Sequence, residues 1–421
     1  MKPLDRRHFL TRSAALVGVG GVGAAVGATL APGAEASAPK SASTANGLTP
    51  DLNVRIPFDG PHQAGVLTTR QDQATFVALD SIAPNQDVLF SALEALSGVA
   101  RTLTQGGPIP TNRIDDPPPD SGILGPVNAP DSLTVTIAFG ASLFDGRYGL
   151  AAQRPRHLTA MPAFAHDELD PYRTGGDVLV QICAGQRDTV VHTYRQLMSA
   201  VAGNLVIRWT IDGFQSAQRG PSPHSSRRNL FAFRDGTGNP DVSDASLMNQ
   251  LIWVQPGAGE PDWAVGGTYL VARTIRMHVE FWDRVGLLEQ EQMIGRDRVT
   301  GAPLGGTGEF QDPDFPQDPK GKRIPLDAHI RLANPRTAAT ANQRILRRGY
   351  NYNRGVDEAG DLDQGLMFIA YNQDPVRQYA TIQNRLGPEP MVDYITPVGG
   401  GYFFAPPGTR GATDWVGSGL A

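Results

Sequence analysis

Residues 178–188 read VLVQICAGQRD, and residues 368–374 carry the same strand-to-helix joint as FIAYNQD. In each copy an apolar run typical of a buried strand gives way to a short polar segment, and an aspartate then opens a helix. The same joint in both halves of the chain indicates an internal duplication.

Each half shows the order β-α-β-β-α-β, which is the split βαβ or ferredoxin-like unit. In the first half we expect strands over 76–82, 133–139, 178–184 and 205–215, with helices over 87–103 and 188–202. In the second half we expect strands over 269–280, 345–351, 366–371 and 401–405, with helices over 281–295 and 376–386. Apolar alternation in the strands and apolar residues at helical spacing in the helices support both sets.

The predicted fold class is therefore α+β, with two tandem ferredoxin-like units that pack sheet to sheet in a barrel of the dimeric α+β type. Domain boundaries are expected at 53–217 for the first unit and 218–421 for the second. A length of 421 residues with 40% apolar side chains is enough for two cores.

The N-terminus, residues 1–36, has the features of an export signal. Arg6 and Arg7 precede Phe-Leu, a Gly/Ala-rich apolar stretch follows, and residues 34–36 offer small side chains for cleavage. This pattern predicts a twin-arginine signal peptide, which exports folded proteins out of the cytoplasm; the alternative is a frayed basic end. Residues 37–52, rich in Ser, Ala, Thr and Pro, are expected to form a disordered lead-in.

Charge and cysteine content exclude several classes of protein. The net charge is −5, and removal of residues 1–36 takes away a net +2 and leaves −7, which argues against nucleic acid as a partner. The single cysteine, Cys183, excludes an intramolecular disulfide and a cysteine-held iron–sulfur cluster. A metal would have to be bound by histidine, carboxylates or a prosthetic group.

The long insertion in the second unit carries a histidine. Residues 327–352 read DAHIRLANPRTAATANQRILRRGYNY, with His329 eighteen residues before Arg347. A lone loop histidine is most often structural. Imidazole is nevertheless the commonest protein ligand of haem iron, and a guanidinium stabilises charge on the opposite face. Because loops of about fifty residues are usually functional or disordered, we interpret this one as functional.

A second polar turn joins the two halves. Residues 229–240 read NLFAFRDGTGNP, and Asp235 is flanked by apolar residues before it and turn-forming residues after it. Its carboxylate should therefore project from a tight turn beside a core. The segment also resembles a plain surface turn or part of a calcium loop, but the glutamate that an EF-hand requires is missing.

Together, residues 233–237 (FRDGT), 329–336 (HIRLANPR) and 346–349 (LRRG) resemble the dye-decolourising peroxidase family. Residues 60–65 (GPHQAG) and 393–405 (DYITPVGGGYFFA) look most like its exported deferrochelatase/peroxidase branch. The resemblance extends from about residue 53 to the end. One departure is Ala232, where the family motif Gly-x-x-Asp-Gly has glycine. We expect alanine to need a negative φ at this position.

The resemblance implies one haem b per chain, with His329 as the proximal ligand of the iron. Asp235 and Arg347 are expected on the distal side, with Asn239 close to them. Asp393 matches the carboxylate that accepts the other ring proton of the proximal histidine, although a solvated loop residue is the alternative.

Two further arginines are candidates for the haem propionates. Arg276 and Arg331 have the charge for this role, but surface or buried ion pairs explain them equally well.

Three functions remain open from the sequence. The first is a haem b peroxidase that uses hydrogen peroxide to oxidise small reducing molecules, in the context of iron uptake and its membrane partner proteins. The second is a haem-handling deferrochelatase that releases iron from haem. The third is a haem-free structural member of the fold, against which the combination of Asp235, His329 and Arg347 argues. A homo-oligomer is possible for all three.

Overall fold

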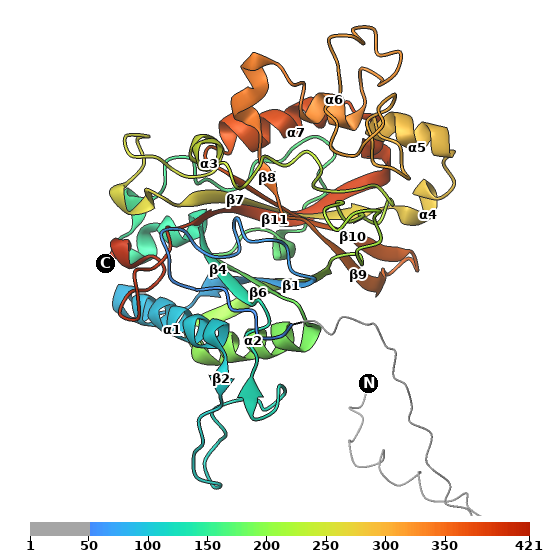
Figure 1. Cartoon of the computed structure of the whole chain (residues 1–421). Helices are drawn as coiled ribbons and strands as arrows, with labels where there is room; N and C mark the ends of the chain where they lie inside the picture. The colour runs from blue at the N-terminus through green and yellow to red at the C-terminus, as the bar shows by residue number, and fades with distance from the viewer. Residues whose placement is uncertain (1–50) are drawn as a thin grey trace, which may run out of the picture. The chain divides into compact units, whose positions relative to one another are not determined.

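The computed structural model describes residues 51–421, and in this range eight strands close into a ring (Figure 1). Around the ring the order is β7-β11-β4-β5-β1-β6-β9-β10, and β10 pairs again with β7. The described strand pairings of this sheet are antiparallel. The predicted α+β barrel of two ferredoxin-like units is confirmed.

The first unit has the strand order β4-β5-β1-β6, with its two helices on one side. Its elements are β1 (Gln73–Ser81), α1 (Gln86–Gln105), β4 (Thr134–Gly140), β5 (Val178–Ala184), α2 (Arg187–Ala200) and β6 (Leu205–Phe214). Asn85 caps α1 by accepting a hydrogen bond from the Val88 N–H at 3.0 Å. The short strands β2 (Gly107–Pro108) and β3 (Val127–Asn128) form a separate ribbon.

The second unit has the matching order β11-β7-β10-β9. Its elements are β7 (Thr268–Met277), α4 (Val279–Trp282), α5 (Leu287–Ile294), β8 (Leu346–Arg347), β9 (Tyr350–Val356), β10 (Leu362–Asn372), α7 (Thr381–Leu386) and β11 (Ile395–Ala405). Two short helices are additional: α3 (Ala245–Leu251) precedes β7, and α6 (His329–Ala333) lies in the long insertion.

Three predicted elements of the second unit are interrupted. The helix expected over 281–295 divides into α4 and α5, because Gly286 is extended and begins a new helix. The strand expected over 345–351 divides into β8 and β9 around Arg348 and Gly349. The helix expected over 376–386 opens with a π-helical turn at Val376–Ala380 before α7 begins.

The two units share a packed interior. Phe76 and Trp209 of the first unit meet Tyr350, Tyr371 and Phe403 of the second in one buried cluster. Few backbone pairings connect the two units: β11 pairs with β4 at two positions, and β6 pairs with β9 at one. Burial of side chains between the sheets therefore contributes more to the closed ring than these few hydrogen bonds do.

The helices cover opposite outer faces of this barrel. In Figure 1, α1 and α2 lie on one side, whereas α5, α6 and α7 lie on the other, above the strands of the second unit. No helix within residues 51–421 is long and apolar enough to cross a membrane. The predicted export signal and nearly all of the lead-in lie outside the described residues.

Candidate functional site

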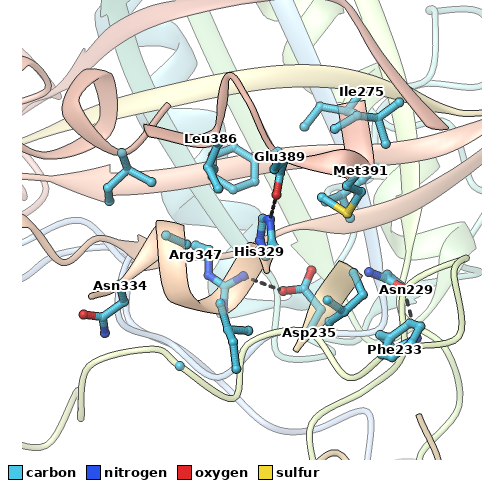
Figure 2. A pocket seen from close by; sticks show the side chains of 18 of the residues that line it. Asn229, Phe233, Asp235, Ile275, His329, Asn334, Arg347, Leu386, Glu389 and Met391 are labelled. Carbon is cyan, nitrogen blue, oxygen red and sulfur yellow. Dashed lines mark hydrogen bonds and ion pairs between the residues drawn. The ribbon is translucent and has the colours of Figure 1, made fainter. Parts of the chain in front are cut away.

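A pocket lies on the outer face of the second unit, between its sheet and the helices α6 and α7 (Figure 2). Most of its lining is apolar. The side chains come from four regions of the chain: Phe231 and Phe233; Ile275 and Met277; Leu366 and Phe368; Leu386, Met391 and Ile395. Such a lining favours a large apolar ligand.

His329 projects into this pocket from the first position of α6. Its Nδ1 lies 2.7 Å from Oε2 of Glu389, a carboxylate whose side chain is only 3% exposed. In the neutral imidazole, Nδ1–H therefore donates to Glu389 and the lone pair remains on Nε2. Among the described residues Nε2 has no hydrogen-bond partner, as a metal ligand requires.

The partner predicted for His329 was wrong. Asp393 is exposed, and Glu389, four residues earlier, takes the position beside the imidazole. Glu389 precedes Pro390, which starts a short 3-10 helix that ends at Tyr394, and this turn directs the two carboxylates differently. The sequence places a carboxylate at both positions and does not show which one faces inward.

Asp235 and Arg347 come together in the same pocket, as predicted. Arg347 Nη1 donates to Asp235 Oδ1 at 3.1 Å, and both side chains are partly buried. Asn239 lies beside them: its amide donates to the Arg347 carbonyl at 2.8 Å, and its Oδ1 accepts from the Arg347 N–H at 3.1 Å. Asn239 thus positions the backbone of Arg347 and is not among the residues that line the pocket.

The turn before Asp235 differs from expectation at Ala232, whose φ is +67° and not negative. Asn229 causes this: its carbonyl accepts from the Ala232 N–H at 3.0 Å, and its Oδ1 accepts from the N–H groups of Phe231 and Phe233. The turn closed by these bonds requires a left-handed residue at position 232. Alanine therefore occupies a conformation that favours glycine.

Arg276 and Arg331 do not line the pocket. Arg276 pairs with Asp357 at 2.7 Å, and Arg331 pairs with Asp318 at 2.9 Å. These contacts favour the ion-pair alternative, and the propionate role of these two residues stays a prediction.

Other arginines surround the pocket. Six line it, against two carboxylates, Asp235 and Glu389: Arg234, Arg273, Arg296, Arg336, Arg344 and Arg347. Within residues 51–421, Arg296 and Arg344 have no carboxylate within 4.0 Å, and Nε of Arg344 is buried without a hydrogen-bond partner.

Burial lowers the pKa of Arg296 to about 10, and the guanidinium groups of Arg336 and Arg347 act in the same direction. Burial also lowers the pKa of Arg344. An anionic ligand would relieve this excess of positive charge.

These features fit haem. Its apolar ring suits the lining, its iron suits Nε2 of His329, and its two propionates suit Arg296 and Arg344. Within residues 51–421 no group of three or more His, Cys, Asp or Glu could hold a bare metal ion. Fold and pocket together define a haem-binding protein of the α+β barrel class.

Comparisons with known proteins lead to the same class. The family model for the N-terminal part of Dyp-type peroxidases matches residues 63–215, and the model for their C-terminal part matches residues 226–410. The chain belongs to the Dyp-type peroxidase family. The family membership, the duplicated fold and the haem cofactor predicted from the sequence are confirmed.

Relatives of known name cover nearly the whole chain. A deferrochelatase of Yersinia pestis is 43% identical over 100% of this chain and 96% of its own length. A deferrochelatase of Escherichia coli K12 is 46% identical over 91% of this chain and 92% of its own length.

Two solved structures are also similar. The DyP-type peroxidase of Cellulomonas bogoriensis has a TM-score of 0.77 and 33% identity, over 87% of this chain and 98% of that one. Ferric DtpA of Streptomyces lividans has a TM-score of 0.78 and 32% identity, over 88% and 99%.

Proposed function

We propose that this protein is a haem peroxidase that uses hydrogen peroxide to oxidise small reducing molecules. The observation that carries the proposal is the pairing, in one pocket, of an imidazole held by a buried carboxylate with an aspartate–arginine pair. The first group suits an iron ligand, and the second suits proton transfer and charge stabilisation.

Four residues of the pocket would hold and orient the cofactor. His329 is the iron ligand, and Glu389 keeps its ring oriented and electron-rich. Arg296 and Arg344 neutralise the propionates. When bound, haem supplies an iron that coordinates peroxide and the redox capacity that oxidises the reducing substrate.

Asp235 and Arg347 then act on peroxide. The Asp235 carboxylate accepts a proton from one peroxide oxygen and returns it to the other, while Arg347 stabilises the negative charge that develops as the O–O bond stretches. Because Arg347 donates to Asp235 Oδ1, one carboxylate oxygen is occupied and the other remains available for the proton.

A second candidate function is release of iron from haem. It is favoured by the 43–46% identity to proteins named deferrochelatase over nearly the full length of the chain. Both functions use the same pocket. They differ in product, because iron release yields metal-free porphyrin and peroxidase turnover yields oxidised substrate.

The test compares Arg347→Leu with a matched variant, Arg354→Leu, which removes an arginine of β9 that pairs with Asp363 and does not line the pocket. With peroxide and a reducing dye, Arg347→Leu should keep its haem but react about 10²–10³-fold more slowly, the usual effect of losing one charge-stabilising donor. Arg354→Leu should match the wild type.

Wild-type rates in Arg347→Leu would transfer the distal role to another residue. If the wild type oxidises no dye but fluorescent metal-free porphyrin accumulates, the second function replaces the first.

Three further predictions from the sequence remain proposals. They are the domain boundary at 217/218, the twin-arginine signal in residues 1–36, and a protein that acts outside the cytoplasm together with membrane proteins of iron uptake. Detection of the mature protein outside the cytoplasm, and its loss when Arg6 and Arg7 are both changed to lysine, would test the signal.

A further inference from the structure

Two arginines clamp the first unit to the second beside the distal pair. Arg348, which is 2% exposed, donates to the carbonyls of Thr68 and Thr69 and to Oε1 of Gln71. Arg70 reaches back in the other direction: Nη2 donates to the Asp235 carbonyl at 2.9 Å, and Nη1 donates to the Gly349 carbonyl at 3.2 Å.

The contacts of Arg70 are specific to the distal residues. One carbonyl belongs to Asp235 itself, and the other lies two residues after Arg347. Within the described chain no side-chain carboxylate lies within 4.0 Å of Arg70. Its two Nη groups therefore donate to backbone carbonyls. A planar guanidinium with two bonds to different segments fixes their separation, which a single ammonium cannot do.

Gly236 makes room for this contact. Its φ is +106°, and a Cβ at this position would lie 2.9 Å from Nη2 of Arg70. Glycine therefore lets the guanidinium approach the Asp235 turn, and a side chain here would displace it.

We propose that Arg70 is a positioning residue for the Asp235–Arg347 pair, so that the first unit sets the distal geometry of a pocket built by the second. This inference rests on the proposed peroxidase function. Arg70 does not line the pocket and acts through the two segments that it joins.

The test compares Arg70→Lys with Arg101→Lys. Arg101 is the control: it also belongs to the first unit and donates to backbone carbonyls, those of Gly411 and Asp414, and it pairs in addition with Asp59; none of these residues lines the pocket. Arg70→Lys should keep its haem and its half-saturation for the reducing dye, but react with peroxide about 10–100-fold more slowly, because small misplacements have effects of this size. Arg101→Lys should lower the melting temperature and leave the rate unchanged.

Two readouts separate positioning from general stability. In an Asp235→Asn/Arg347→Leu background, Arg70→Lys should cause no further loss of rate, because Arg70 acts only through the placement of these two residues. Hydrogen exchange of the haem-loaded full chain should rise in peptides that cover 234–240 and 345–351 for Arg70→Lys, and not for Arg101→Lys.

Wild-type exchange and rate in Arg70→Lys would overturn the proposal, as would an equal loss of rate in the background that lacks both Asp235 and Arg347. If the wild-type protein has no peroxidase activity, the proposed function fails by itself, and the exchange experiment still decides whether Arg70 holds the two segments.

Discussion

At the scale of single residues, Glu389 determines how His329 can act. The imidazole is bonded through Nδ1 to a carboxylate that is almost fully buried and has no guanidinium within 4.0 Å among the described residues. A carboxylate in this position orients the ring and increases its basicity toward a metal. The orientation of His329 thus depends on a second residue of the pocket.

Glu389→Ala should lower haem affinity about 10–100-fold, the usual effect of removing a carboxylate that supports a metal-bound histidine. Glu389→Gln should have a smaller effect, since the amide oxygen still accepts the Nδ1 proton. Haem titration followed by absorbance measures both. Asp393→Ala is the control and should bind haem as the wild type does; a loss in Asp393→Ala equal to that in Glu389→Ala would restore Asp393 as the partner.

Ala232 is the residue at which stability can be gained. Its left-handed conformation costs about 1–2 kcal/mol for an alanine, and glycine at the same position gives back about 0.5–1 kcal/mol in the flexibility of the unfolded chain. Ala232→Gly should therefore raise the free energy of unfolding by up to about 1 kcal/mol, measured by urea denaturation. Ala95→Gly, within α1, should lower it by a similar amount. Destabilisation by Ala232→Gly would show that the turn is not strained.

At the scale of elements, the long insertion holds α6 through Asp318. The Asp318 carboxylate accepts from the N–H groups of Lys322 and Ile324 at 2.8 and 3.0 Å, and it pairs with Arg331 of α6. Hydrogen bonds from the backbone, first that of Ile324, lower the pKa of Asp318. The helix that carries His329 is therefore anchored by an ionised carboxylate.

The sign of the pH effect follows from this lowered pKa. Above about pH 4, the unfolded-state value for aspartate, the stabilising contribution of Asp318 is fully present, and it is lost as the pH falls through the lower folded-state value. Asp318→Asn should lower the melting temperature at pH 7 and weaken its dependence on pH below about 4. Identical acid profiles for the variant and the wild type would show that another group controls this region.

Elements were predictable where the local pattern was strong. The strands of the first unit, β7, β10 and β11 of the second, and the helices α1 and α2 follow from apolar periodicity and capping residues. The breaks in the second unit were not predictable, because they depend on long-range contacts: Arg348 interrupts the strand between β8 and β9 and donates to residues 68–71 of the other unit. The choice of Glu389 over Asp393 likewise depends on how a short turn orients two nearby carboxylates.

At the scale of the whole molecule, the duplication was visible in the sequence. The sequence did not show which unit forms the pocket or which residues of the other unit contact it. The second unit supplies the pocket, yet Arg70 of the first unit contacts the backbone beside both distal residues. The arginines that we propose for the propionates, Arg296 and Arg344, lie at the two ends of the long insertion. Neither arginine lies in a recognisable sequence motif, because its role depends on which residues the fold places around the pocket.

We infer that this barrel binds haem through His329, and haem titration of His329→Ala is the decisive experiment. His166→Ala, which removes an exposed histidine, is the control. We expect the His329 variant to remain folded by circular dichroism, to lose at least about 100-fold in haem affinity, and to change the absorbance spectrum of any haem that remains, because the iron has lost its protein ligand. Full haem affinity with an unchanged spectrum in His329→Ala would show that another residue binds the iron.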